Sequence, residues 1–129
     1  MRLKESLNKV ANYSKEGEYP RFEYTFTLQP NVNLEISCQI LHHESGYTTI
    51  NFNTKGDNNL TDDPKSNFII FSTLTQIVQN HLKEYDVEKI KCGSPVQKKL
   101  DIYEKLFKRF GDGWSVHRDE YKIFVQRKR

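Results

Sequence analysis

The sequence predicts one α+β domain in which an antiparallel meander is followed by a helix, a strand, a second helix and a terminal hairpin. Apolar residues alternate with polar ones in several runs between residues 22 and 53, which is the pattern of half-buried strands. The spacing changes to that of a helix over residues 64–85 and again over residues 94–110, and alternation returns after residue 114. Because 129 residues suffice for one packed core and not for two, residues 1–129 are assigned to a single domain.

The N-terminal half supplies a helix and then the meander. Apolar residues near the N-terminus are spaced for one helical face, which predicts a short helix over residues 2–14 and a linker to residue 17. Alternating runs over residues 22–28, 32–40 and 47–53 predict three strands joined by turns. These strands form the predicted antiparallel meander.

The next predicted element is a long helix over residues 64–85. It begins at Asp62-Asp63-Pro64, where acidic side chains and a proline suit a helix N-terminus. Its broad apolar face consists of Phe68, Phe71, Leu74, Ile77, Val78, Leu82 and Tyr85. Residues 54–63, which precede this helix, have no periodicity and form the longest predicted loop.

A short strand over residues 87–92 leads to the second helix, which opens with Ser94-Pro95-Val96-Gln97. This run predicts a capping box, in which the Ser94 hydroxyl accepts from the Gln97 amide while the Gln97 side chain reaches back. The buried stripe of the second helix is predicted to be Val96, Leu100, Tyr103, Phe107 and Phe110, with Gly111 at its end. The predicted core combines Phe71, Leu74, Val78, Ile90, Leu100, Tyr103 and Phe107.

The C-terminal residues predict a hairpin. Residues 114–116 and 121–126 alternate between apolar and polar side chains on either side of Arg118-Asp119-Glu120. The basic residues 127–129 follow as a tail that is expected to fray.

Charge and composition exclude several classes of protein. A net charge of +3 is a mild excess that favours solubility over nucleic-acid binding. Cys38 and Cys92 have no metal-ligand spacing and are expected to be reduced and buried. No run approaches the length of about 20 apolar residues that a membrane span needs, so a soluble, cytoplasmic protein is expected.

The order of the predicted elements resembles the fold of the GNAT acyltransferase family without its first strand. The segment Ile102-Tyr103-Glu104-Lys105-Leu106 is similar to the family's Leu-Tyr-Glu-Lys-Leu segment, whose tyrosine commonly protonates the leaving thiolate. In the family, the strand after the long helix splays from its neighbour and acyl-coenzyme A lies in the gap. The resemblance therefore implies acetyl-coenzyme A as a cofactor and Tyr103 as a catalytic acid.

The departures from this family favour a protein without a cofactor. Where the family has a glycine-containing loop whose amides hold the pyrophosphate, this chain has Asp62, Asp63 and Pro64, which oppose a phosphate. The position of Tyr103 on the apolar stripe also favours a core tyrosine over a catalytic one. The chain further resembles small phage-encoded proteins of unknown function, which have Gly-Asp before the long helix and a tyrosine on the second helix.

Other candidate sites have simpler structural interpretations. The adjacent His42 and His43 point to opposite sides of a strand and lack a third ligand at fixed spacing, which disfavours a metal site. The acidic loop that begins near Asp57 lacks the glycine and glutamate of a calcium-binding loop. The lysines of the second helix resemble a phosphate-binding stripe, but interspersed carboxylates favour a solvated face.

Three functional hypotheses follow. The leading one is a non-catalytic binding protein, a phage accessory protein that acts on a host or viral protein partner in the host cytoplasm. The second is a divergent acyltransferase that uses acyl-coenzyme A, and the third is a weak nucleic-acid-binding protein. Long polar loops in compact domains are often functional, so the predicted binding residues are Asp57, Asp62 and Asp63 of the loop with Lys98 and Lys99 of the second helix.

Overall fold

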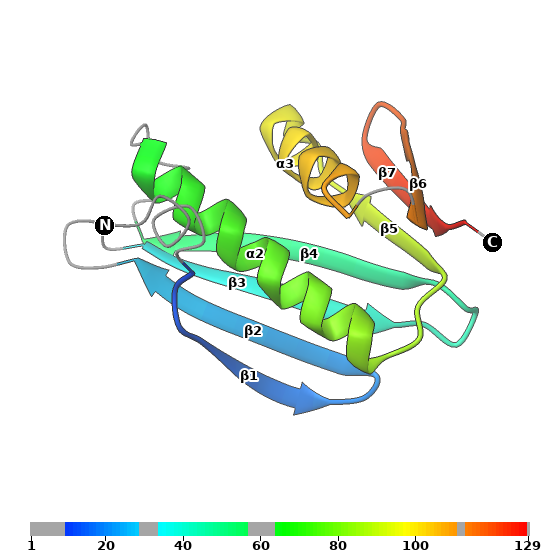
Figure 1. Ribbon diagram of the computed structural model, residues 1–129, viewed down its shortest axis with the longest axis horizontal. Helices are drawn as coiled ribbons and strands as arrows, with labels where there is room; N and C mark the ends of the chain where they lie inside the picture. Colours follow the sequence, from blue (N-terminus) through cyan, green and yellow to red (C-terminus); the bar gives the residue numbers. More distant parts are fainter. Residues whose placement is uncertain (1–9, 29–33, 57–63, 111–112, 129) are drawn as a thin grey trace.

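The chain forms a single seven-stranded sheet with two helices, seen in a computed structural model that describes residues 10–28, 34–56, 64–110 and 113–128 (Figure 1). The strand order across the sheet is β1-β2-β3-β4-β5-β7-β6. Neighbouring strands are antiparallel except β4 and β5, which are parallel. The predicted α+β class, with a mostly antiparallel sheet, is therefore confirmed.

The element order follows the predicted one with one strand added at the N-terminus. The strands of the first half are β1 Tyr13–Glu18, β2 Arg21–Leu28, β3 Leu34–His42 and β4 Thr48–Gly56. They are followed by α2 Pro64–Glu84, β5 Lys89–Gly93, α3 Gln97–Lys108, β6 Trp114–Arg118 and β7 Lys122–Arg127. Because β4 extends to Gly56, the predicted loop over residues 54–63 begins with three strand residues.

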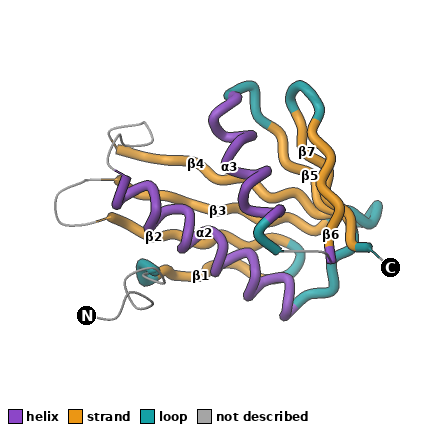
Figure 2. Tube along the Cα trace, turned by 45° about the horizontal axis from the view of Figure 1, so that its top comes forward, coloured by secondary structure: helices purple, strands orange, loops and turns teal. Residues whose placement is uncertain are grey.

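Both helices cover the same face of the sheet. The strand register places Tyr24, Cys38 and Phe52 opposite one another, so their side chains share one face. On that face His81 of α2 contacts Tyr24, and Tyr103 of α3 contacts Phe52. The two helices also contact each other (Figure 2). No helix among the described residues lies on the opposite face, whose side chains are largely polar.

The core lies between this face and the two helices. The predicted core residues Leu74, Val78, Ile90, Leu100, Tyr103 and Phe107 are all buried. Phe71 is only partly buried and packs against the margin of the core. The Arg109 guanidinium lies over its ring, 5.3 Å from the centroid. Cys38 and Cys92 are buried and free, as expected for inert thiols. None of the described helices is long and apolar enough to cross a membrane.

The predicted N-terminal helix is wrong where the structure describes it. Residues 1–9 lie outside the described part, but Tyr13 and Ser14 belong to β1, which pairs with β2. Gly17 has φ +92°, and a Cβ there would lie 2.5 Å from the Arg21 carbonyl oxygen, so this position near the end of β1 requires glycine. The β1 side chains are mostly exposed because β1 is an edge strand, and its sequence therefore lacks the alternation that marks the other strands.

The predicted capping box of α3 is also wrong. The Ser94 hydroxyl accepts a hydrogen bond from the Val96 amide at 3.0 Å, while Val96 is the N-cap residue and no side chain caps the helix. Val96 is 49% exposed and does not belong to the buried stripe. The Gln97 side chain does not reach back, because it donates instead to the carbonyl oxygen of Glu120 in the terminal hairpin. The other predicted helix ends, at residues 62–63 and 111, lie outside the described residues.

The first two residues of the predicted C-terminal tail make backbone hydrogen bonds. Arg127 is the last residue of β7, and its amide donates to the Glu88 carbonyl oxygen. The Lys128 amide donates to the Gly113 carbonyl oxygen at 2.8 Å. Arg127 and Lys128 are therefore hydrogen-bonded to the folded domain, and residue 129 lies outside the described residues.

Candidate functional site

The first candidate site is the gap that opens between β4 and β5. These parallel strands pair through Thr48 with Ile90 and Thr49 with Lys91, and the pairing ends there although β4 continues to Gly56. Buried backbone groups need hydrogen-bond partners, so the free edge of β4 beyond Thr49 must be satisfied by another element.

Tyr103 of α3 fills this gap. Its hydroxyl accepts a hydrogen bond from the Phe52 amide at 3.1 Å and donates to the Asn51 side-chain oxygen at 3.1 Å. The ring packs on Phe52 with 4.5 Å between centroids, and Tyr103 is 1% exposed. Tyr103 thus takes the place of the missing strand partner.

This arrangement holds the Tyr103 hydroxyl by two hydrogen bonds within the protein. Burial raises the pKa of its hydroxyl well above the ordinary tyrosine value, so the group stays neutral. A tyrosine hydroxyl has one proton to donate, and here that proton is bonded to Asn51 rather than directed into an open cavity.

The predicted binding lysines lie next to this gap. The Lys99 ammonium group donates to the Asn53 side-chain oxygen at 3.3 Å, which brings the start of α3 to the second half of β4. Lys98 is exposed. The carboxylates predicted to accompany them, Asp57, Asp62 and Asp63, lie outside the described residues. The structure thus places Lys99 beside the strand that leads directly into the acidic loop.

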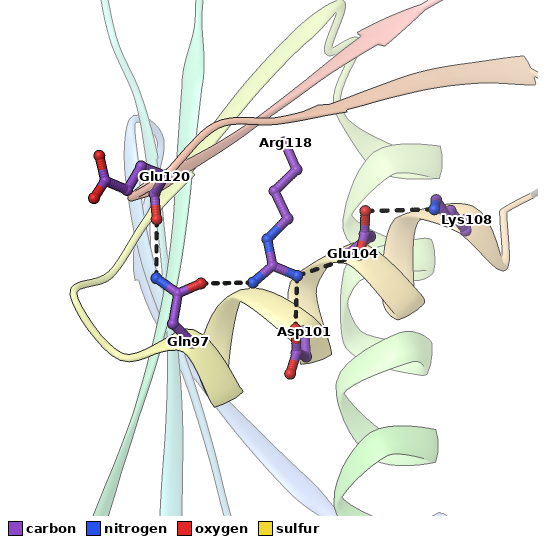
Figure 3. A network of polar contacts seen from close by, with 6 residues as sticks. All are labelled: Gln97, Asp101, Glu104, Lys108, Arg118 and Glu120. Carbon is purple, nitrogen blue, oxygen red and sulfur yellow. Dashed lines mark hydrogen bonds and ion pairs between the residues drawn. The ribbon is translucent and has the colours of Figure 1, made fainter.

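A polar network holds the other side of α3 to the terminal hairpin (Figure 3). The Arg118 guanidinium donates to Asp101 at 2.6 Å, to Glu104 at 3.3 Å and to the Gln97 side-chain oxygen at 2.8 Å. These groups are partly or largely exposed, and exposed ion pairs contribute little to stability. The main effect of the network is therefore to fix the position of α3.

Several cations of the predicted phosphate-binding stripe of α3 make contacts within the protein. Lys108 pairs with Glu104 at 3.4 Å, Arg109 covers the Phe71 ring, and Lys99 is bonded to Asn53. These cations are therefore engaged within the protein. Lys98 and Lys105 of the same helix are exposed.

A second candidate is a buried polar cluster between the sheet and α2. His81 Nδ1 lies 2.8 Å from the Tyr24 hydroxyl, and His81 Nε2 lies 2.8 Å from His42 Nε2. His42 Nδ1 lies 3.1 Å from the Thr48 hydroxyl. All four side chains are buried, so solvent and substrates do not reach this chain of hydrogen bonds.

Burial keeps both histidines of the cluster neutral. It lowers the pKa of His81 to about 4, with a further contribution from His42, and it lowers the pKa of His42. Neutral imidazoles fit the cluster because each ring donates once and accepts once. If both rings were protonated, two N–H donors would face each other across 2.8 Å. The cluster is thus a neutral hydrogen-bonded unit that locks α2 onto β2 and β3.

The structure also bears on the predicted histidine and cysteine chemistry. His42 and His43 do point to opposite sides, because His43 stacks on Tyr47 at 4.2 Å outside the buried cluster. In the described ranges no group of three or more potential ligands is placed to hold a metal ion. Burial raises the pKa of the Cys38 thiol to about 12 and that of Cys92 well above its ordinary value, so neither is a reactive thiolate.

Comparison with known proteins adds no family to this description. No protein-family model matches the chain, and no curated protein matches it.

Sequence reasoning singled out Tyr103 and Lys99 but missed the buried cluster. His81 falls seven residues after Leu74 and therefore on the same helical face, and Tyr24 falls two residues after Phe22 and two before Phe26, so it shares the inward face of its strand. These two periodicities predict that both polar side chains point inward. Pairing them requires the strand register, which the sequence does not contain.

Proposed function

We propose that this chain is a non-catalytic binding protein that acts on a protein partner, of the kind that phages encode as accessory proteins. The observation that carries the proposal is the Tyr103 hydroxyl, which is buried in the gap between β4 and β5 and bonded to Phe52 and Asn51. An acyl group bound there would have to displace this hydrogen-bonded side chain.

We further propose that the scaffold is GNAT-like. The resemblance implies a strand after the long helix that splays from its neighbour, and here β5 leaves β4 after two residue pairs. The parallel pair at the centre of an otherwise antiparallel sheet, and the insertion of β7 between β5 and β6, support the same scaffold.

The loop before α2 supports the absence of catalysis. A pyrophosphate is bound by close-approaching backbone amides without nearby negative charge. Asp62, Asp63 and Pro64 supply two carboxylates and remove one amide donor at that position of the sequence. Coenzyme A would thus meet electrostatic repulsion at the loop and a filled gap at Tyr103.

We propose that the partner contacts the acidic loop and the start of α3. The residues are Asp57, Asp62 and Asp63 with Lys98 and Lys99. The hydrogen bond from Lys99 to the end of β4 supports their proximity, because β4 leads into this loop. A surface with both signs of charge favours a protein partner over a nucleic acid.

The proposal is tested by capture of the partner with charge-matched variants. Asp57, Asp62 and Asp63 are replaced by Asn together, and the control replaces the exposed Glu16, Glu18 and Glu44 by Gln, which removes the same charge elsewhere. Recovery of the partner from host lysate, measured by quantitative mass spectrometry, is expected to fall for the first variant and to stay unchanged for the control. Melting temperatures show whether both variants are folded. Equal recovery by parent and both variants would show that the loop is only a connector.

The two alternatives give different results. An acyltransferase binds acetyl-coenzyme A saturably and loses turnover, but not binding, on Tyr103→Phe. A nucleic-acid-binding protein shows a steep decrease in affinity with salt concentration.

A further inference from the structure

A groove at the far end of α2 is not part of the site described above. It lies between the last turns of α2 and the terminal hairpin, whereas the acidic loop precedes the first residue of α2. Its volume is about 490 Å³, within the range of about 300–1,000 Å³ that is usual for ligand sites. The lining residues that matter here are Leu82, Lys83, Phe110, Trp114, Arg127 and Lys128.

Arg127 is held in place at one wall of this groove. Arg127 and Trp114 are cross-strand partners of β7 and β6, and the guanidinium lies over the indole ring at 4.9 Å from its centroid. Its Nε atom is buried and has no hydrogen-bond partner among the described residues. Its ion pair with Asp86 is long, at 3.9 Å, and the Asp86 side chain is 86% exposed. The Arg127 side chain is 38% exposed, and a guanidinium fixed on an aromatic ring is suited to a planar carboxylate.

The remaining lining residues combine positive charge with apolar surface. Lys83 and Lys128 are exposed at the groove, so with Arg127 it carries three cations. Leu82, Phe110 and Trp114 supply apolar surface, and all three are only partly buried. The groove therefore complements a ligand that has negative charge beside a large apolar group.

We propose that this groove binds an acidic peptide segment of a partner protein, with a large apolar side chain against Leu82, Phe110 and Trp114 and a carboxylate on Arg127. This inference rests on the proposed function, because it assigns the chemistry of a protein partner. It adds a second contact surface, which lies at the C-terminal end of α2 and includes neither Lys98 nor Lys99.

A peptide fits this surface better than a nucleic-acid strand. Single strands are bound by stacking bases on exposed aromatic faces, and one face of Trp114 is already covered by Arg127.

The test uses a displayed library of random dodecapeptides, selected on the parent chain. One variant combines Lys83→Glu and Lys128→Glu in the groove. The matched control combines Lys105→Glu and Lys122→Glu, two exposed lysines outside it that give the same change in charge. Thermal melts confirm that all chains are folded, and fluorescence anisotropy gives the Kd of each selected peptide.

The selected peptides are expected to carry Asp or Glu next to Leu, Phe or Trp. The groove variant should raise their Kd at least about tenfold, which is the scale of one lost charge-assisted contact, while the control leaves it unchanged. Arg127→Lys keeps the charge but lacks the fork that grips a carboxylate, so it should also weaken binding severalfold. The proposal is overturned if no acidic-apolar motif is enriched, if the control weakens binding as much as the groove variant, or if a single-stranded oligonucleotide competes more tightly than the peptides.

These outcomes separate the groove from the proposed function. If a partner is captured through the acidic loop and the start of α3 but no peptide binds the groove, only the inference about the groove is refuted. Turnover of acetyl-coenzyme A removes the proposed non-catalytic function, while the peptide measurements still report on the groove.

Discussion

Acidification should destabilise this protein through the buried pair His42 and His81. In the unfolded chain a histidine has its ordinary pKa of 6.5, whereas burial and the neighbouring His42 lower the pKa of His81 to about 4 in the folded chain. Above pH 6.5 both states are neutral at this residue, so it adds no pH dependence. Between about pH 6.5 and pH 4 the unfolded chain binds a proton that the folded chain does not, and stability falls as the pH decreases. A difference of about 2.5 pKa units corresponds to about 3 kcal/mol.

Urea unfolding at a series of pH values measures this effect, with His81→Gln as the test variant. Carboxylates also contribute to acid unfolding, so the informative quantity is the difference between parent and variant. The variant should be less stable at neutral pH, because Tyr24 and His42 lose a partner, and it should lose less stability on acidification. His117→Gln, at an exposed position of β6, is the control and should follow the parent. If the parent and His81→Gln lose the same free energy of unfolding between pH 7 and pH 4, the buried pair does not remain neutral and the reasoning fails.

Three further substitutions test the fold by urea unfolding at neutral pH. Tyr103→Phe removes the partner of the buried Phe52 amide and should lower the free energy of unfolding by about 1–3 kcal/mol. A decrease smaller than half of the lower value would mean that water replaces the hydroxyl. Leu74→Ala deletes a fully buried side chain and should cost about 2–5 kcal/mol, whereas a negligible change would show that α2 does not face the core there. Gly17→Ala should cost about 1–3 kcal/mol, because its Cβ would press on the Arg21 carbonyl oxygen, and an unchanged midpoint would contradict the positive φ.

The sequence predicts those elements whose burial alternates with a regular period. The strands β2, β3, β4 and β7 each place one face on the core, and α2 buries one side, so their apolar residues repeat at two or about 3.6 residues. β1 has one neighbour and exposed side chains, and its polar sequence therefore resembles a linker.

The start of α3 could not be predicted from local sequence. Ser94 to Gln97 has the residue types of a capping box, but Arg118 and the Glu120 carbonyl oxygen bind the Gln97 side chain from the hairpin. A tertiary contact thus replaces the local one, and it comes from more than 20 residues further along the chain.

Individual residues of the candidate sites could be predicted from the sequence, but the contacts between them could not. Tyr103 is recognisable from its segment, but its bond to the Phe52 amide depends on where β5 leaves β4. The groove joins α2 to both ends of the terminal hairpin, and the stacking of Arg127 on Trp114 follows from strand register alone. No spacing in the sequence contains either arrangement.

Calorimetric titration of the full chain with acetyl-coenzyme A tests most directly the claim that the protein binds a partner without catalysis. With the gap filled by Tyr103 and carboxylates at the loop, no saturable heat is expected at submillimolar cofactor, for the parent or for Tyr103→Phe. The contradicting result is saturable binding at micromolar cofactor by both chains, with acyl transfer to an amine by the parent and none by Tyr103→Phe. That outcome would make Tyr103 a catalytic acid and the protein an acyltransferase.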